Sequence, residues 1–319
     1  MTTRLIMKHK NLVLLLIITI FIFGVFMGTS PQTFLAPDIY QAFLETVPFT
    51  GILALGLTLV LVAGEIDLSF PSLMAFASFG FASVVLATKS VLLGLITGLV
   101  TGIAVGAFNG FVTTRIGVPS IITTLGMQFL IRGASNLLAA GRARSLQCLL
   151  ENPLCNVFTG RLGGILPVQA IWFFSLAFVL GLLLFRHKFG DQVLFVGDNP
   201  RAATMVGIDV RRVKTYVFML MGAIAALVGI LDCFRLRTWW PTMGDGILMT
   251  VMATVFIGGT SMFGGEGSIA GTVIGAFLVG SLEAGIVAAG LSGFWTRFVD
   301  GALILIAVIV HTILRMRGE

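Results

Sequence analysis

The stretch FLETVPFTGILALGLTLVLVA, residues 43–63, decides the fold of this chain. Glu45 is its one charged residue, and every position after Glu45 is apolar or is glycine, proline or threonine. A helix that is hydrophobic all round is buried in a large core or lies in a membrane. Because about 20 such residues are needed to cross the hydrocarbon core of a bilayer, the stretch predicts a membrane-spanning helix.

The same pattern recurs along the whole chain. Hydrophobic residues make up 57% of the 319 positions and charged residues 11%, whereas a soluble domain carries about 25% charged residues. The chain is therefore expected to be an all-α integral membrane protein of about ten transmembrane helices, some of them broken or re-entrant. The apolar runs lie at 12–29, 43–63, 70–87, 91–113, 119–140, 168–185, 215–234, 246–262, 268–289 and 296–314.

The positions of lysine and arginine predict the topology. Cytoplasmic loops carry the excess of these residues, and an even number of helices places both termini in the cytoplasm. A single transmembrane domain, 1–319, is then expected, with a cytoplasmic segment at 186–214 and a periplasmic one at 141–167. The run 12–29 is long for the apolar core of a signal peptide and is expected to be an uncleaved first helix. The cytoplasmic cations would be Arg4, Lys8, Lys10, Arg115, Arg186, Lys188, Arg201, Arg211, Arg212, Lys214, Arg315 and Arg317, against a smaller outer group that includes Lys89, Arg142, Arg144 and Arg161.

A short helix is expected within 197–208, GDNPRAATMVGI. Asn199 or Asp198 can cap its start, Pro200 suits the first helical position, and Gly207 suits a left-handed stop. So short a helix is marginal alone in water and must pack against something. Two interpretations remain open from spacing alone: a folded connector that lies against its own protein, or a docking element for a cytoplasmic partner.

Charged and glycine-rich positions are the other candidates for function. A charge at the centre of a membrane helix costs about 2.5 to 3.5 kcal/mol on insertion scales, so Glu65 and Arg132 draw attention, although an inter-helix salt bridge is the more ordinary explanation. The stretches 64–69 and 258–268 are expected to be tight turns or helix breaks. Gly271 and Gly275 form a GxxxG pattern, which predicts close helix packing.

Several kinds of chemistry are missing from the sequence. There is no GxxxxGK[ST] loop, so any ATP must be bound and hydrolysed, with Mg²⁺, on a separate subunit. No nucleophile elbow or HExxH pattern is present, and the chain is expected to be neither an enzyme nor a holder of a cofactor or metal. The net charge of +6 is scattered and does not predict nucleic-acid binding. Cys148 and Cys155 can pair only if their segment is periplasmic, and the sequence leaves their redox state open.

Four ordered motifs give the chain a family resemblance. They are residues 51–60 with 64–69 (GEIDLS), then Asn109-Gly110 with 118–120 (VPS), 124–126 (TLG) and Arg132-Gly133, then 197–208, and finally Gly258-Gly259-Thr260-Ser261 with 264–268 (GGEGS). Between about residues 43 and 312 the chain resembles the membrane permease subunits of bacterial ABC importers for ribose, xylose, arabinose and related simple sugars.

The resemblance implies an architecture and a set of partners. It implies a permease of the vitamin B12-importer (type II) kind in the bacterial inner membrane, paired with a second permease and with cytoplasmic ATPases, and supplied by a periplasmic substrate-binding protein. The polar candidates for the translocation pathway are Glu65, Asn109 and Arg132. The glycine-rich turn comprises Gly258, Gly259, Gly264, Gly265 and Gly267. The coupling segment comprises Gly197, Asp198, Asn199, Pro200, Ala202, Ala203, Gly207 and Ile208.

Alternatives differ in substrate or in energy source. A related permease could carry nucleosides or branched-chain amino acids instead of a monosaccharide or polyol. An ion-driven secondary transporter could also have buried acidic residues and glycine breaks. A membrane scaffold would show no flux. The sequence identifies neither the sugar nor whether the permease pair is a homodimer or a heterodimer.

Overall fold

The computed structural model describes residues 2–318, with side chains for residues 12–309, 312 and 313. The predicted cytoplasmic cations Arg4, Lys8, Lys10, Arg315 and Arg317 have side chains outside this described set, and Met1 and Glu319 lie outside the described residues altogether. Everything below refers to the described part of the chain.

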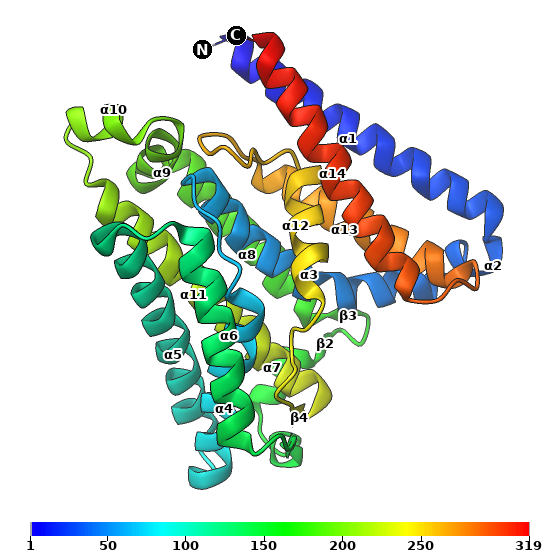
Figure 1. Ribbon diagram of the computed structural model, residues 1–319. Coiled ribbons are helices and arrows are strands. Elements are labelled where there is room, and N and C mark those ends of the chain that lie inside the picture. Colours follow the sequence, from blue (N-terminus) through cyan, green and yellow to red (C-terminus); the bar gives the residue numbers. More distant parts are fainter. Residues whose placement is uncertain (1, 319) are drawn as a thin grey trace.

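Each predicted apolar run falls on one helix (Figure 1). The ten helices are α1 (Thr2–Thr29), α3 (Pro37–Val62), α4 (Phe70–Thr88), α5 (Val91–Phe111), α6 (Ser120–Ala139), α8 (Val168–Arg186), α11 (Val210–Leu236), α12 (Ile247–Ile257), α13 (Ile269–Ala288) and α14 (Phe294–Gly318). The mainly helical fold was therefore predicted correctly.

Fewer helices than the predicted ten have the length and hydropathy of a membrane crossing in the described residues. Seven helices in the described residues are long and apolar enough to span a bilayer: α1, α3, α4, α5 continued through Ile116, α8, α11 and α13. Helix α12 has 11 residues and is about 16 Å long, only about half the thickness of the hydrocarbon core. The run 246–262 was thus wrong as a complete span, because its last residues form a glycine turn, and the count of ten crossings stays a prediction.

Short elements connect these helices. They are α2 (Pro31–Phe34), the π-helical turn η1 (Val112–Ile116), the 3₁₀ turn η2 (Gln147–Leu149), α7 (Leu154–Thr159), α9 (Lys188–Asp198), α10 (Pro200–Met205), and strands β1 (Arg144–Ser145), β2 (Arg161–Leu162), β3 (Leu166–Pro167) and β4 (Thr238–Trp239). The strands form two antiparallel pairs, β1 with β4 and β2 with β3. Helices α9 and α10 lie toward one end of the bundle and the strands toward the other (Figure 1).

Glycines allow the central helices to pack closely. A Cβ on Gly102 of α5 would lie 2.3 Å from the carbonyl oxygen of Gly222 in α11, and a Cβ on Gly106 would lie 2.2 Å from that of Phe218. The predicted packing role of Gly271 and Gly275 is confirmed, because their Cβ atoms would lie 2.0 and 2.6 Å from carbonyl oxygens of α12 and its C-cap. Small residues at helix contacts are what membrane bundles use in place of a hydrophobic driving force.

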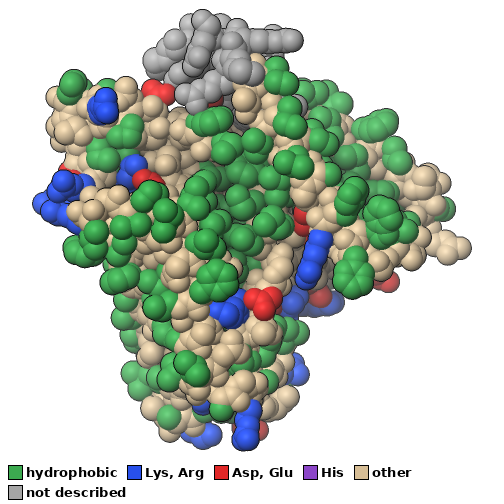
Figure 2. Space-filling model, viewed as in Figure 1, with side chains coloured by type: hydrophobic (Ala, Val, Ile, Leu, Met, Phe, Trp, Pro, Cys, Tyr) green, Lys and Arg blue, Asp and Glu red, His purple; other side chains and the backbone are tan. Residues whose placement is uncertain are grey.

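The outside of the bundle is apolar. Large hydrophobic side chains are exposed along several helices, for example Phe129 and Leu137 of α6, which are 70% and 83% exposed. Figure 2 shows such side chains spread over much of one face, with charged residues in small groups between and beyond them. An apolar surface of this extent is suited to contact with lipid or with another membrane subunit, not with water.

Candidate functional site at the glycine junction and coupling helix

The predicted short helix in 197–208 is present as α10, six residues from Pro200 to Met205. Asn199 is its N-cap, and its Oδ1 accepts hydrogen bonds from the backbone N–H of Arg201 at 3.1 Å and of Ala202 at 3.0 Å. Gly207 follows the helix with φ of +85°, as its sequence position predicted. The backbone N–H of Ile208 then donates to the carbonyl of Ala203 at 3.0 Å and closes the end of the helix.

Helix α10 has a buried side and an exposed tip. Ala203 is 1% exposed and belongs to the hydrophobic core, which is the packing that so short a helix was expected to need. Met205 and Val206 are 88% and 72% exposed, although both are apolar. An apolar tip held out by a well-capped helix has the form of a docking element.

Four glycines from three distant segments meet where α9 joins α10. We call Gly64, Gly197, Gly264 and Gly265 the glycine junction. A Cβ on Gly197 would lie 1.7 Å from the carbonyl oxygen of Val62, and a Cβ on Gly264 would lie 2.9 Å from Cα of Gly64. The backbone N–H of Gly265 donates to the Val62 carbonyl at 2.9 Å. Only glycine fits at these approaches, so three of the sequence motifs are parts of one packed structure.

The rest of the late glycine turn is also explained by geometry. Gly259, Gly264 and Gly265 all have positive φ, which confirms the expected tight turns. A Cβ on Gly258 would lie 2.7 Å from the backbone nitrogen of Thr272, so this residue allows α12 and α13 to approach. A Cβ on Gly267 would lie 2.4 Å from a methyl group of Val62. The turn therefore joins α12 and α13 to the end of α3.

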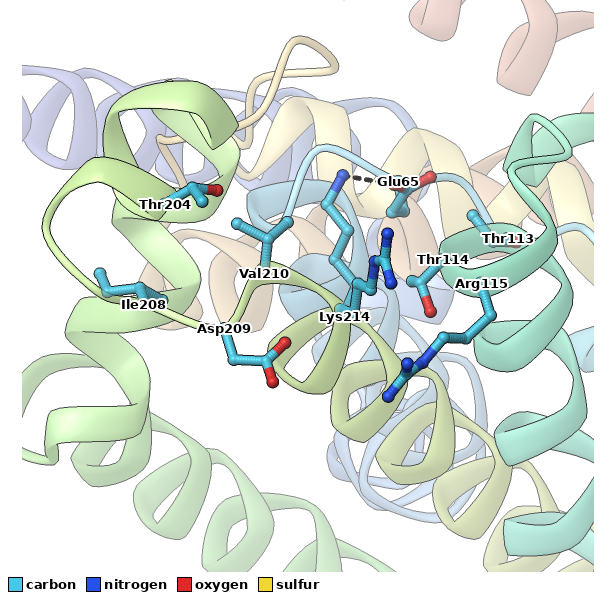
Figure 3. Close-up of a pocket in the computed structure, with 10 residues that line it drawn as sticks. Glu65, Thr113, Thr114, Arg115, Thr204, Ile208, Asp209, Val210 and Lys214 are labelled. Atoms are coloured by element: carbon cyan, nitrogen blue, oxygen red, sulfur yellow. Dashed lines mark hydrogen bonds and ion pairs between the residues drawn. The ribbon is translucent and has the colours of Figure 1, made fainter.

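Glu65, one of the three pathway candidates, lies beside this junction. Its Oε1 accepts a hydrogen bond from Nζ of Lys214 at 2.5 Å, and the two side chains are 11% and 14% exposed. The pair borders a cavity of about 630 Å³ between η1, the start of α11 and the segment after α10 (Figure 3). Glu65 thus forms a salt bridge between segment 63–69 and α11, with a partner that the sequence did not reveal.

Asn109, the second candidate, is fully buried in α5. Its Nδ2 donates to Oγ of Ser69 at 2.9 Å, and that hydroxyl donates to Oδ1 of Asp67 at 2.6 Å. The remaining oxygens, Oδ1 of Asn109 and Oδ2 of Asp67, are buried without a hydrogen-bond partner in the described structure. The cluster anchors segment 63–69 inside the bundle.

Segment 63–69 is also fixed to α6. The backbone N–H of Ile66 donates to Oγ of Ser120 at 3.2 Å, and that of Leu68 donates to Oγ1 of Thr124 at 3.0 Å. These contacts join the early motif to the middle one. Hydroxyls close to a break in helical structure would have been the signal for finding them, because an extended backbone in a membrane must find side-chain partners.

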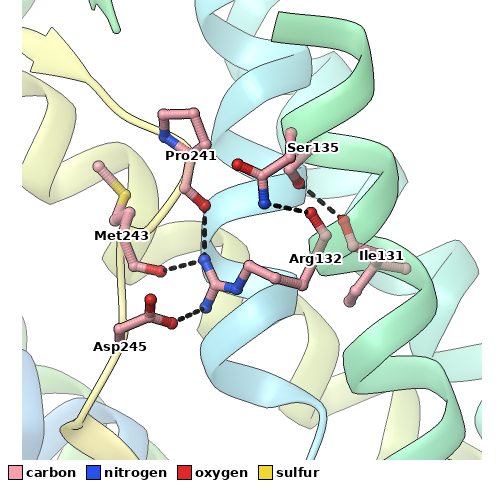
Figure 4. A network of polar contacts seen from close by, with 7 residues as sticks. Ile131, Arg132, Ser135, Pro241, Met243 and Asp245 are labelled. Atoms are coloured by element: carbon pink, nitrogen blue, oxygen red, sulfur yellow. Dashed lines mark hydrogen bonds and ion pairs between the residues drawn. The ribbon is translucent and has the colours of Figure 1, made fainter. Parts of the chain in front are cut away.

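Arg132, the third candidate, holds a different segment. Its Nη1 donates to the carbonyls of Pro241 at 2.6 Å and Met243 at 2.9 Å, and its Nη2 lies 2.8 Å from Oδ1 of Asp245 (Figure 4). Arg132 thus forms a salt bridge, but its carboxylate partner lies in the loop before α12 and not on another helix, as the expected inter-helix pair would require. In the described residues no hydrogen bond or ion pair joins the networks of Glu65, Asn109 and Arg132 to one another, so they form no single polar site.

The cysteines and the possible metal ligands are the remaining candidates for chemistry. Cys148, Cys155 and Cys233 are free thiols. No group of three or more His, Cys, Asp or Glu residues in the described set could hold a metal ion. What the arrangement can do is mechanical: it connects an exposed helix tip to the ends of several membrane helices.

Comparison with known proteins agrees with the motif resemblance. Residues 39–308 match the family model described as "Branched-chain amino acid transport system / permease component". The ribose import permease protein RbsC of Escherichia coli (strain K12) is 32% identical over 96% of this chain and 94% of its own. RbsC of Bacillus subtilis (strain 168) is 33% identical over 91% and 90%. The L-arabinose ABC transporter permease protein AraH of Azospirillum brasilense is 31% identical over 86% and 80%.

A solved structure supports the fold alone. A metal-chelate type ABC transporter in an inward-facing conformation aligns with a TM-score of 0.53 at 14% identity. The alignment covers 94% of this chain and 99% of that one. At this identity the similarity concerns the path of the helices and carries no information on the substrate.

Proposed function

The chain belongs to the family of branched-chain amino acid transport system permease components, and from this membership we propose that it is the membrane subunit of an ATP-driven importer of a monosaccharide or polyol. The observation that carries the proposal is the similarity to ribose and arabinose permeases at 31 to 33% identity over at least 86% of this chain. The subunit is not an enzyme, and ATP with Mg²⁺ is bound and hydrolysed on a separate ATPase.

The substrate class follows from the relatives rather than from the family's name. That name mentions branched-chain amino acids, which is one of the alternatives left open by the sequence. The near full-length relatives named above import ribose and arabinose, and they favour a sugar. Uptake of radiolabelled ribose, arabinose and xylose, with leucine and uridine as competitors, tests this choice. Failure to take up any of the three sugars would contradict it, and so would stronger inhibition by leucine or uridine than by the unlabelled sugar.

The coupling step is assigned to α10 and the glycine junction. Closure of the ATPase pair would move the exposed tip at Met205 and Val206. The junction at Gly197 would pass this motion to the end of α3 and to the turn before α13, because the backbones there are in direct contact. The permease pair would thereby rock between outward-open and inward-open states.

The topology and remaining partners complete the proposal. Helices α1 and α14 carry the two chain ends toward the end of the bundle that holds α10 (Figure 1), which supports two cytoplasmic termini in the bacterial inner membrane. The predicted cytoplasmic cations Arg186 and Lys188 lie where α8 meets α9, and α9 leads directly into α10. A second permease, a periplasmic substrate-binding protein and membrane lipid are the other expected partners.

Co-purification tests the proposal directly. The tagged protein is isolated from native membranes in mild detergent, and its bound subunits are identified by mass spectrometry. We expect an ATPase with a P-loop, and the presence or absence of a second, different permease decides between heterodimer and homodimer. Absence of any ATPase after crosslinking, together with uptake that collapses on addition of an uncoupler at constant ATP, would favour the ion-driven transporter instead.

A further inference from the structure

The cavity beside the coupling helix has a surplus of positive charge. It is lined by two carboxylates, Glu65 and Asp209, and both are engaged: Glu65 with Lys214, and Asp209 with Arg212 at 3.0 Å. Two further guanidinium groups, Arg115 of η1 and Arg211 of α11, also line it. Neither has a carboxylate partner in the described structure, and both side chains are exposed.

The two guanidinium groups suit an anionic ligand. Arg binds carboxylate and phosphate oxygens with paired hydrogen bonds, so Arg115 and Arg211 together can hold a carboxylate or a phosphate group. The volume, about 630 Å³, is several times that of a single anionic group, so the cavity admits a side chain together with its neighbours.

The position of the cavity indicates where the anionic group comes from. Thr204 of α10 and Ile208 just after it form one wall, and the exposed apolar tip at Met205 and Val206 lies between them in sequence (Figure 3). A partner that covers this tip would lie next to Thr204 and Ile208, at the edge of the cavity. A small free anion would not explain why the charge surplus adjoins the docking element.

We propose that the cavity between η1 and α10 is a second contact for the cytoplasmic ATPase, which inserts an acidic loop between Arg115 and Arg211 while its main groove holds the apolar tip of α10. This inference rests on the proposed function and adds to it the charge of the partner's surface. The two contacts contribute differently to the interface with the ATPase. The apolar tip contributes buried area, and the two guanidinium groups orient the partner and select it by charge.

The test measures binding of the ATPase identified by co-purification to the permease in lipid nanodiscs. The double variant Arg115→Glu/Arg211→Glu is expected to weaken the affinity about tenfold at about 0.05 M salt and to flatten its salt dependence. Arg115→Lys/Arg211→Lys keeps the charges and is expected to bind within about threefold of the wild type. Arg186→Glu, an exposed arginine at the end of α8 outside the cavity, is the matched control and should change the affinity less than about twofold.

Three outcomes would overturn the inference. Unchanged ATPase affinity in the Glu/Glu variant would show that the cavity is not a contact. Retained ATPase affinity together with loss of binding to inorganic phosphate, or to vesicles containing anionic lipid, would make the cavity a site for free anions or for lipid headgroups. Failure of the wild-type permease to bind any ATPase would remove the proposed function and this inference with it, and that result is distinguishable because it does not depend on the variants.

Discussion

The two ends of the coupling segment differ in how they are packed. Its base, Gly197, is buried, and a Cβ there would lie 1.7 Å from one backbone oxygen and 2.6 Å from the backbone nitrogen of Gly265. Its tip, at Met205 and Val206, is 88% and 72% exposed. The change occurs abruptly, since every residue from Asp198 to Ala202 is exposed.

A tightly packed base can pass motion of the tip to the membrane helices. A close-packed contact has no slack, so displacement of one side must displace the other or break the contact. The base is in contact with both the end of α3 and the turn before α13, through Val62 and Gly265. We interpret the segment as a rigid lever with a free tip. Substitutions at the base, at the tip, at the cap between them and at the adjacent ion pair should therefore differ in their effects.

Gly197→Ala should have the largest effect. The added Cβ meets backbone atoms on two sides, and neither can move without shifting α3 or the glycine turn. We expect a loss of about 3 kcal/mol or more in the free energy of unfolding, seen as a lower Tm in detergent and as loss of uptake. Gly24→Ala in α1 is the matched control, because a Cβ there has no atom within 4 Å. A Gly197→Ala variant as stable and active as Gly24→Ala would contradict the rigid base.

Ala203→Pro and Gly207→Pro should disable the tip and leave the base intact. Proline at 203 removes the hydrogen bond from the Ala203 N–H to the Asn199 carbonyl, 3.0 Å, at a cost of about 3 kcal/mol, and proline at 207 cannot adopt φ of +85°. We expect normal membrane insertion, loss of ATPase co-purification and no uptake.

A glycine with positive φ outside the coupling segment provides the control for these proline variants. Gly290 also has positive φ and open space around it, between α13 and α14. Gly290→Pro should retain ATPase binding, measured by the same co-purification. Normal uptake by a properly inserted Ala203→Pro variant would falsify the coupling assignment.

The fold was largely predictable because it rests on local patterns. Apolar runs predicted ten helices, and Asn199, Pro200 and Gly207 predicted both ends of α10, since capping depends on neighbouring residues only. The close contact of α5 with α11 at Gly98, Gly102, Gly106 and Gly110 was not predicted, although the four-residue spacing of these glycines is visible in the sequence. The helix predicted over 246–262 was too long, because hydropathy does not indicate where a glycine turn ends a helix.

The site was less predictable because its contacts join distant segments. The motifs containing Gly64, Gly197 and Gly264 were each recognised, but nothing local to any of them states that they touch. Glu65 and Arg132 were selected for their charge, yet their partners Lys214 and Asp245 are 149 and 113 positions away in sequence. The roles of Glu65, Asn109 and Arg132 in translocation therefore stay predictions, whereas their hydrogen bonds and ion pairs are established by the structure.

Asn199→Ala should have an intermediate effect, because it weakens the connection between base and tip without removing either. The backbone N–H groups of Arg201 and Ala202 lose their shared acceptor, which costs about 1 kcal/mol of helix stability. We expect uptake to fall several-fold with the Tm unchanged. Asn199→Ser, which is also a good N-cap, should restore most of the uptake. Equal loss in the Ala and Ser variants would show that Asn199 acts through a contact other than the cap.

The ion pair between Glu65 and Lys214 should contribute least, and a double-mutant cycle measures how much. Both side chains are mostly buried, at 11% and 14% exposure, whereas the pair of Glu45 and Arg161 is 35% and 48% exposed. We expect Glu65→Gln and Lys214→Gln to show a coupling energy of about 1 kcal/mol in thermal unfolding, and the corresponding cycle at Glu45 and Arg161 to give less than about 0.5 kcal/mol. Salt should weaken the second coupling more than the first, since exposed charges are screened more strongly. Equal coupling energies would mean that the Glu65–Lys214 pair contributes no more than an exposed pair, and segment 63–69 would then be held by the glycine junction and by its hydrogen bonds to Asn109, Ser120 and Thr124.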